Sequence, residues 1–384
     1  MTGALEERFY RNFEERGELG ASLSIWKGGK EIVSLHHGWA DPGKTIPWTH
    51  GTVAPVWSAT KGPAAITFLL ALEKAGVSPH DPVAKVWPEL LAAQDGRLTF
   101  VQILSHQAGL PALSPENRPH LLSHREVIAA LERQKPFWSP GDGHGYHPRT
   151  IGFLLDEIVR KVAGGLPLGR YWNTHVAAPL QLEFWIGDFP APVLGRLAMM
   201  VPPKGQHPSE EELPFYRALA QPDSLSLAAF ASPSGMRSLA EINQLEFLQA
   251  GLPAFGGIGS ACALAKFYQI LARDGVSDGV EVIPARVVRT ARALQSSGHD
   301  RTLLLPTAFT GGFKTDPLDG RGQKIRALFG PSMTAFGQPG AGGSHAFADP
   351  ERGHSFAYVM NQMEAGILPN RKSLDLVDLL YSAT

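Results

Sequence analysis

The sequence predicts an α/β protein whose main body is assembled from both ends of the chain, with a mostly helical domain inserted between them. Strand-like segments lie near both termini of the 384 residues, and helix-like segments fill the middle. Hydrophobic residues make up 43% of the chain and charged residues 18%, which is typical of a compact globular protein. We therefore assign residues 1–62 and 250–384 to the α/β domain and residues 63–249 to the helical domain.

The N-terminal elements follow from periodicity and turn chemistry. ALEERFYRNFEER (4–16) has the apolar spacing of an amphipathic helix. GASLSIW (20–26) and KEIVSLHHGWA (30–40) are typical of strands, and the glycine-containing segment 27–30 between them predicts a tight turn. From about Ser58 a helical pattern continues to Gly76, a residue type that often ends helices.

The middle and the C-terminal part separate into helix-like and strand-like segments. The helix-like segments are 98–106, 124–134, 149–164, 169–180, 260–275 and 373–383. The strand-like segments are 334–338, 344–350 and 354–362.

Charge and hydropathy exclude several classes of partner. Lys+Arg 35 against Asp+Glu 36 leaves a formal charge of -1, so there is no basic surplus for a nucleic-acid backbone. The longest apolar run is interrupted by Glu73 and Lys74, and the acidic N-terminus has no apolar signal core. We expect a cytoplasmic protein that binds neither nucleic acid nor membrane; the sequence does not specify an oligomeric state.

Metal and cofactor motifs are weak in this chain. Cys262 is the only cysteine, which excludes an intrachain disulfide, and its apolar neighbours predict a buried, unreactive thiol. The pairs His36–His37 and His144–His147 have no supporting carboxylates, so we interpret them as structural or solvent-facing residues. We expect no metal and no cofactor.

A G-x-S-x-G pattern occurs at residues 275–279, around Ser277. In α/β-hydrolases this pattern lies between a buried strand and a helix. Here it follows a predicted helix in a polar, glycine-flanked turn, so we interpret it as a chance match.

The pair Ser58 and Lys61 carries a different chemistry. Residues three apart at the start of a helix share one face, so the Lys61 amine can reach the Ser58 hydroxyl. A desolvated lysine loses its proton easily and can act as a base, although S-x-x-K also arises by chance in helices. Pro63 complicates the pattern: either the turn at Ser58 is irregular, or the regular helix begins at Pro63.

Two further stretches favour the catalytic interpretation. In PGDGHGYHPRTIGFLL (140–155), Tyr146 follows a glycine-rich turn and precedes an amphipathic helix. In AFGQPGAGGSHAFADP (335–350), a glycine-rich strand permits close approach of another backbone or of a ligand.

In this order the three stretches resemble the serine β-lactamase and penicillin-binding-protein superfamily, with family VIII carboxylesterases and class C β-lactamases as the closest groups. The resemblance extends over nearly the whole chain, from GASLSIWKGG near the N-terminus to HSFAYVMNQM near the C-terminus. It implies a β-lactamase-like fold, an antiparallel sheet flanked by helices with an inserted helical domain. It also places the active site at the junction of the two domains.

The resemblance assigns roles to individual residues. Ser58 corresponds to the nucleophile, Lys61 to its proton acceptor and Tyr146 to the tyrosine that shuttles a proton to the leaving group. The backbone N–H groups of Ser58 and Ala341 correspond to the oxyanion hole. The neighbouring residues Trp57, His147, Gln338 and Gly340 are expected to bind substrate.

Two departures from the β-lactamase pattern point toward esters. Tyr146-His147-Pro148 replaces Tyr-x-Asn, and Gln338-Pro339-Gly340 replaces Lys-Thr-Gly. The chain therefore lacks the amide and the charged side chain that hold a β-lactam.

We predict a serine carboxylesterase that acts through a Ser58 acyl-enzyme on short-chain or moderately bulky esters. The alternatives are an acyltransferase with the same acyl-enzyme, a β-lactamase or D-amino-acid peptidase, and a catalytically inactive binding module.

Overall fold

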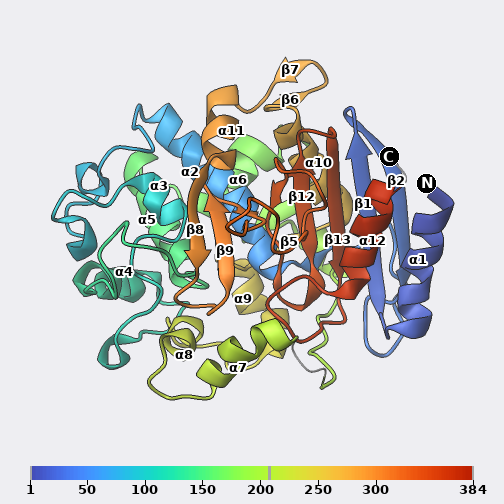
Figure 1. Cartoon of the computed structure of the whole chain (residues 1–384), viewed down its shortest axis with the longest axis horizontal. Coiled ribbons are helices and arrows are strands. Elements are labelled where there is room, and N and C mark those ends of the chain that lie inside the picture. Colours follow the sequence, from blue (N-terminus) through green and yellow to red (C-terminus); the bar gives the residue numbers. More distant parts are fainter. Residues whose placement is uncertain (1, 206–208, 383–384) are drawn as a thin grey trace.

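The computed structural model describes residues 2–205 and 209–382 and is built around an eight-stranded sheet (Figure 1). The strand order is β2-β1-β13-β12-β11-β10-β9-β8, and every neighbouring pair is antiparallel. The strands are β1 (Gly20–Lys27), β2 (Lys30–Gly38), β8 (Leu294–His299), β9 (Pro306–Thr310), β10 (Lys314–Thr315), β11 (Phe336–Gly337), β12 (His345–Asp349) and β13 (His354–Met360). The predicted fold class is confirmed.

Segments from both ends of the chain lie side by side in this sheet. β1 pairs with β2 on one side and with β13 on the other. The turn between β1 and β2 has positive φ at Gly28 (60°) and Gly29 (83°), which side-chain-bearing residues rarely adopt. The predicted hairpin is therefore confirmed, together with its turn.

Helices cover both faces of the sheet. The Ser355 hydroxyl on β13 donates to the Ala265 carbonyl of α10 (Ala261–Ala272). Tyr358 lies three residues further along β13, and its ring contacts Phe9 of α1 (Thr2–Glu15). Residues an odd number apart point to opposite faces of a strand, so α10 and α1 lie on opposite sides.

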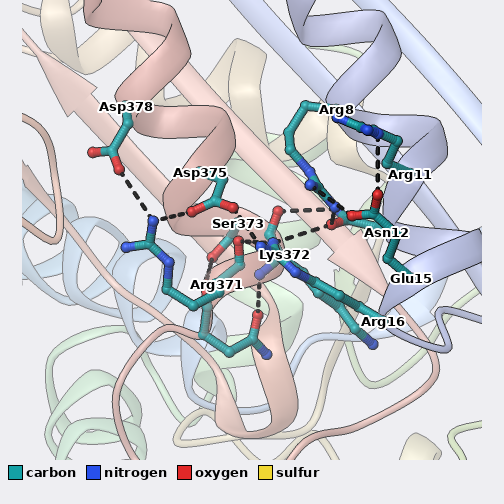
Figure 2. A network of polar contacts seen from close by, with 11 residues as sticks. Arg8, Arg11, Asn12, Glu15, Arg16, Arg371, Lys372, Ser373, Asp375 and Asp378 are labelled. Carbon is teal, nitrogen blue, oxygen red and sulfur yellow. Dashed lines mark hydrogen bonds and ion pairs between the residues drawn. The ribbon is translucent and has the colours of Figure 1, made fainter.

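A polar network joins α1 to the C-terminal helix α12 (Arg371–Ser382), as Figure 2 shows. Arg16 donates to the Arg371 carbonyl at 2.6 Å and pairs with the Asp375 carboxylate at 2.5 Å. Asn12 donates to the Lys372 carbonyl at 3.0 Å. These contacts bind the first helix to the last and so close the body of the protein around its two ends.

From α2 (Lys61–Lys74) up to β5 (Gly257–Gly259), the described residues are mostly helical, with one short strand. Their helices are α2, α3 (Phe100–Leu104), α4 (His124–Arg133), α5 (Thr150–Val162), α6 (Leu168–Trp172), α7 (Leu213–Leu219), α8 (Leu225–Phe230) and α9 (Leu245–Gln249). The strand β4 (Phe184–Ile186) pairs with β5 (Gly257–Gly259), which also pairs with β3 (Ala54–Pro55). The division into two domains stays a prediction.

The remaining elements connect α10 to β8, the strand at one edge of the large sheet. A small hairpin of β6 (Val276–Ser277) and β7 (Val280–Glu281) is followed by α11 (Ala285–Arg292), which leads into β8. Among the helices of the described residues, none is both long and apolar enough to cross a membrane.

Candidate active site

The site begins where the small sheet leads into α2. Residues Trp57–Thr60 form a 3₁₀ turn, and the α-helix proper starts at Lys61. Pro63 is the third residue of that helix, where its missing N–H removes no intrahelical hydrogen bond. Pro63 is therefore compatible with an irregular turn at Ser58, the first of the two arrangements that the sequence allowed.

Trp57 holds the Ser58 turn in an unusual conformation. Its φ is +50°, in the left-handed region that non-glycine residues rarely occupy. The indole is buried and stacks on Phe255 with centroids 6.3 Å apart. Thr60 closes the turn by donating to the Trp57 carbonyl at 2.5 Å while accepting from the Gly257 N–H at 2.9 Å. Such local strain, held by surrounding contacts, is a feature of functional sites.

Ser58 lies between an amine and a phenol. The Lys61 amine nitrogen is 3.2 Å from the Ser58 hydroxyl oxygen, as the three-residue spacing predicts. The Tyr146 hydroxyl donates to the same oxygen at 2.8 Å. The structure thus brings together Ser58, Lys61 and Tyr146, although the motif of Tyr146 lies far along the chain from the other two.

The surroundings of Lys61 favour its neutral form. The side chain is buried, and burial lowers its pKa well below the usual value, with Lys314 adding a repulsive contribution. The amine donates to the carbonyls of Pro148 at 3.0 Å and Ala254 at 2.8 Å. A neutral amine has two N–H groups and one lone pair. When both N–H groups point to these carbonyls, the lone pair is left for the Ser58 hydroxyl, as a base requires.

Tyr146 is fixed through its backbone as well as its ring. The Asp300 carboxylate accepts the Tyr146 N–H at 3.0 and 3.1 Å, and the N–H groups of Thr302 and Leu303 at 2.8 Å each. The Tyr146 ring stacks on Phe309 at 6.2 Å. Burial raises the pKa of the phenol, so Tyr146 rests as a neutral proton donor. Asp300 was not anticipated from the sequence, where it is one polar residue of a loop.

We expected His147 to bind substrate, but in the structure its imidazole is buried and bonded to the backbone. Its side chain is fully buried, its Nδ1 lies 2.6 Å from the Gly145 carbonyl, and its Nε2 accepts the Leu110 N–H at 3.0 Å. Burial lowers its pKa to about 3. Both ring nitrogens are engaged by the backbone, so the imidazole supports the Tyr146 loop and has no free polar atom for a ligand.

The glycine-rich stretch after β11 approaches the Ser58 turn closely. A Cβ on Gly340 would lie 2.1 Å from the Val56 carbonyl oxygen, so only glycine allows this approach. Ala341 is the first residue of a short 3₁₀ turn, Ala341–Gly343, and an N–H at that position has no acceptor within its own turn.

Gln338 is almost fully buried on the same stretch. Its N–H donates to the Ala346 carbonyl at 2.9 Å. Its side-chain amide donates to the Pro339 carbonyl at 3.4 Å. The side chain carries no charge, so this position supplies no cation to the site.

A second lysine, Lys314 on β10, also reaches Tyr146. Its ammonium lies 4.8 Å from the centroid of the Tyr146 ring, the same distance as the Lys61 amine. Lys314 was not anticipated from the sequence, because a lysine in a short strand is most often solvent-facing.

The weaker motifs lie outside this cluster. Ser277 belongs to the β6–β7 hairpin, not to a turn between a strand and a helix, and it donates to Asp278 at 3.2 Å. Glu31, His50 and Cys262 bring one ligand atom each within 4.8 Å of one another. Cys262 is half-buried rather than fully buried as expected, and burial raises its pKa to about 12. This opposes the thiolate that a metal would bind.

An antiparallel sheet with this hydroxyl, amine and phenol beside it is typical of the β-lactamase-fold serine hydrolases. The chain belongs to the β-lactamase family, whose model matches residues 7–376. The resemblance noted from the sequence is thereby confirmed.

Similar proteins include esterases and a penicillin-binding-protein homologue. "Esterase/beta-lactamase LipL" of Mycobacterium tuberculosis is 29% identical over 357 residues, 92% of this chain and 80% of LipL. The crystal structure of a penicillin-binding-protein homologue from Caulobacter crescentus superposes with a TM-score of 0.86 at 31% identity, covering 100% of this chain and 97% of that one. A family VIII carboxylesterase superposes with a TM-score of 0.85 at 29% identity, with the same coverage.

Proposed function

We propose that this protein is a serine carboxylesterase that cleaves short-chain or moderately bulky esters through an acyl-enzyme on Ser58. The observation that carries the proposal is the placement of the Ser58 hydroxyl within hydrogen-bond distance of both Lys61 and Tyr146. A serine hydroxyl becomes a nucleophile when an adjacent base takes its proton.

The proposed acylation step carries one proton from Ser58 to the leaving alcohol by way of Lys61 and Tyr146. Lys61 takes the Ser58 proton as the hydroxyl oxygen attacks the ester carbonyl carbon. The negative charge that forms on the carbonyl oxygen is stabilised by the N–H groups of Ser58 and Ala341. Tyr146 then gives its proton to the departing alkoxide as the bond between carbonyl carbon and alcohol oxygen breaks, and Lys61 returns a proton to Tyr146.

Deacylation repeats the sequence with water. The water oxygen attacks the acyl carbon while its proton passes through Tyr146 to Lys61. The bond between that carbon and the Ser58 oxygen then breaks, Ser58 takes the proton back from Lys61, and the carboxylic acid leaves. Trp57 and Gly340 line the approach to Ser58 in this proposal. The glycine at 340 allows the chain that carries the Ala341 N–H to pass beside Val56.

The neighbourhood of Tyr146 favours esters over β-lactams. Pro148 has no side-chain amide, and the buried Gln338 carries no charge to attract a β-lactam carboxylate. The printed names of the similar proteins, an esterase/β-lactamase and a family VIII carboxylesterase, are consistent with this ranking. An acyltransferase that passes the acyl group to another alcohol is the alternative for the same acyl-enzyme.

The test compares substrates on the purified protein. Hydrolysis of p-nitrophenyl esters of increasing acyl length is measured in parallel with hydrolysis of the β-lactam nitrocefin. We expect clear turnover of short acyl esters and β-lactam turnover lower by roughly two to four powers of ten, because each missing polar contact costs about 1–3 kcal/mol. Efficient nitrocefin hydrolysis with weak ester hydrolysis would reverse the ranking.

A further inference from the structure

Lys314 is a buried residue whose ammonium forms no hydrogen bond or ion pair with the residues that the structure describes. The residue is 7% exposed, with the ammonium 4.8 Å from the centroid of Tyr146 and 5.8 Å from that of Phe309. Aromatic faces attract a cation but compensate only part of its lost hydration.

Another buried lysine shows how this protein otherwise stabilises such a charge. Lys372 is 1% exposed and pairs with the carboxylates of Glu18 at 3.3 Å and Glu364 at 3.1 Å. Lys314 has no comparable partner among the described residues. A buried charge without an ionic partner costs stability. We therefore ask what the charge of Lys314 contributes beside Ser58, Lys61 and Tyr146 that a neutral side chain would not.

Lys314 and Lys61 flank the same aromatic ring. Each nitrogen lies 4.8 Å from the centroid of Tyr146, and Lys61 is in contact with the Ser58 hydroxyl. Positive charges on the two amines repel each other, so protonation of one disfavours protonation of the other.

The other titratable groups near Tyr146 affect Lys61 and Lys314 differently. Burial lowers the pKa values of His106, His144 and His147, so these rings are neutral near pH 7. The Asp300 carboxylate attracts the charge of Lys314 and raises its pKa, although burial dominates and lowers it to about 8.

No carboxylate of the described residues raises the pKa of Lys61 in the same way. The repulsion by Lys314 adds to the effect of burial on its pKa. A proton shared between the two sites is therefore held on Lys314 in preference to Lys61.

We propose that Lys314 is a positioning residue of the acyl-transfer site, whose ammonium keeps Lys61 in the neutral form that can accept the Ser58 proton. The inference rests on the proposed function of Ser58 and Lys61. β10 pairs with β11 through Lys314 and Gly337, so the charge comes from the strand adjacent to the uncharged Gln338.

The test is the pH dependence of kcat/KM for Lys314→Met, with Lys314→Arg as the matched variant that keeps the charge. The substrate is p-nitrophenyl acetate, which carries no charge of its own. In Lys314→Met, Lys61 should keep its proton up to a higher pH. The part of the profile where kcat/KM rises with pH, here called the rising limb, should therefore move about one pH unit to the alkaline side. At pH values below the wild-type limb, kcat/KM then falls about tenfold, and it recovers at high pH. Lys314→Arg should keep the limb of the wild-type protein.

Lys314→Gln serves as a second neutral variant if Lys314→Met does not fold, as judged by circular dichroism. A loss of activity that is equal at every pH would assign Lys314 a structural role and overturn the inference. The inference would also be overturned if Lys314→Met left the rising limb unmoved and raised KM only for p-nitrophenyl hydrogen succinate. That result would make Lys314 a binding group for anionic substrates.

Failure of the proposed function would look different. A wild-type protein that neither hydrolyses the acetate ester nor reacts with a fluorophosphonate would overturn that function, and the role of Lys314 with it. An active wild-type protein whose limb does not respond to Lys314→Met overturns the role of Lys314 alone.

Discussion

The Tyr146 hydroxyl donates a 2.8 Å hydrogen bond to the Ser58 hydroxyl across 88 positions of the chain. Asp300 accepts hydrogen bonds from the Tyr146 backbone, and Phe309 stacks on the Tyr146 ring. The phenol is thus held at the nucleophile before any substrate arrives, as preorganised proton transfer requires.

Tyr146→Phe should remove the proton donor and leave the stacking intact. We expect kcat for ester hydrolysis to fall about 10²- to 10⁴-fold, the usual contribution of a positioned acid or base. Tyr171→Phe, at another buried tyrosine, is the matched control and should retain activity. Equal turnover of the Tyr146→Phe variant and the wild-type protein would mean that the leaving group takes its proton from elsewhere.

Lys61→Arg should be nearly inactive, because a guanidinium does not give up its proton near neutral pH. In the wild-type protein, activity should rise with pH as Lys61 loses its proton. Because burial lowers the pKa of Lys61, this rise should lie below the usual lysine value of about 10.4. The measurement is kcat/KM as a function of pH for both proteins; substantial turnover by the arginine variant would restrict Lys61 to a structural role.

Gly340→Ala should displace the segment that carries the Ala341 N–H, because a Cβ there would lie 2.1 Å from the Val56 oxygen. We expect kcat to fall about 10²- to 10³-fold, as on loss of one oxyanion donor. Gly195→Ala is the control, since its Cβ would meet nothing within 4 Å. The proposed oxyanion hole would be in doubt if both variants kept full activity.

Ser58→Ala should abolish ester hydrolysis, with a loss of roughly 10⁴-fold or more, and leave the fold intact. Ser277→Ala, in the unrelated G-x-S-x-G turn, should have almost no effect. Steady-state kinetics and thermal unfolding of both variants provide the comparison. Loss of activity in Ser277→Ala with full activity in Ser58→Ala would identify Ser277 as the nucleophile instead.

Local sequence patterns predicted the elements that carry the site but not all of its contacts. The three-residue spacing of Ser58 and Lys61 suffices to predict their contact, because it depends on one turn of chain. The hairpin of β1 and β2 follows from alternation and its glycines. The helix start was ambiguous, because Pro63 is compatible with more than one turn geometry.

Contacts between distant segments were beyond such reasoning. His147 was expected to bind substrate because it follows Tyr146, but neighbouring residues of an extended segment point in different directions, and its imidazole is bound by Gly145 and Leu110. Asp300 and Lys314 become part of the site only through the pairing of distant strands and loops. No local periodicity encodes that proximity.

Covalent labelling decides whether Ser58 is the nucleophile, on which every proposed step depends. The purified protein is treated with a fluorophosphonate, digested, and analysed by tandem mass spectrometry to locate the adduct. We expect one modified residue, Ser58, and loss of ester hydrolysis in proportion to labelling. An adduct on Ser277 or another residue, or full ester hydrolysis by a protein labelled at Ser58, would contradict the assignment.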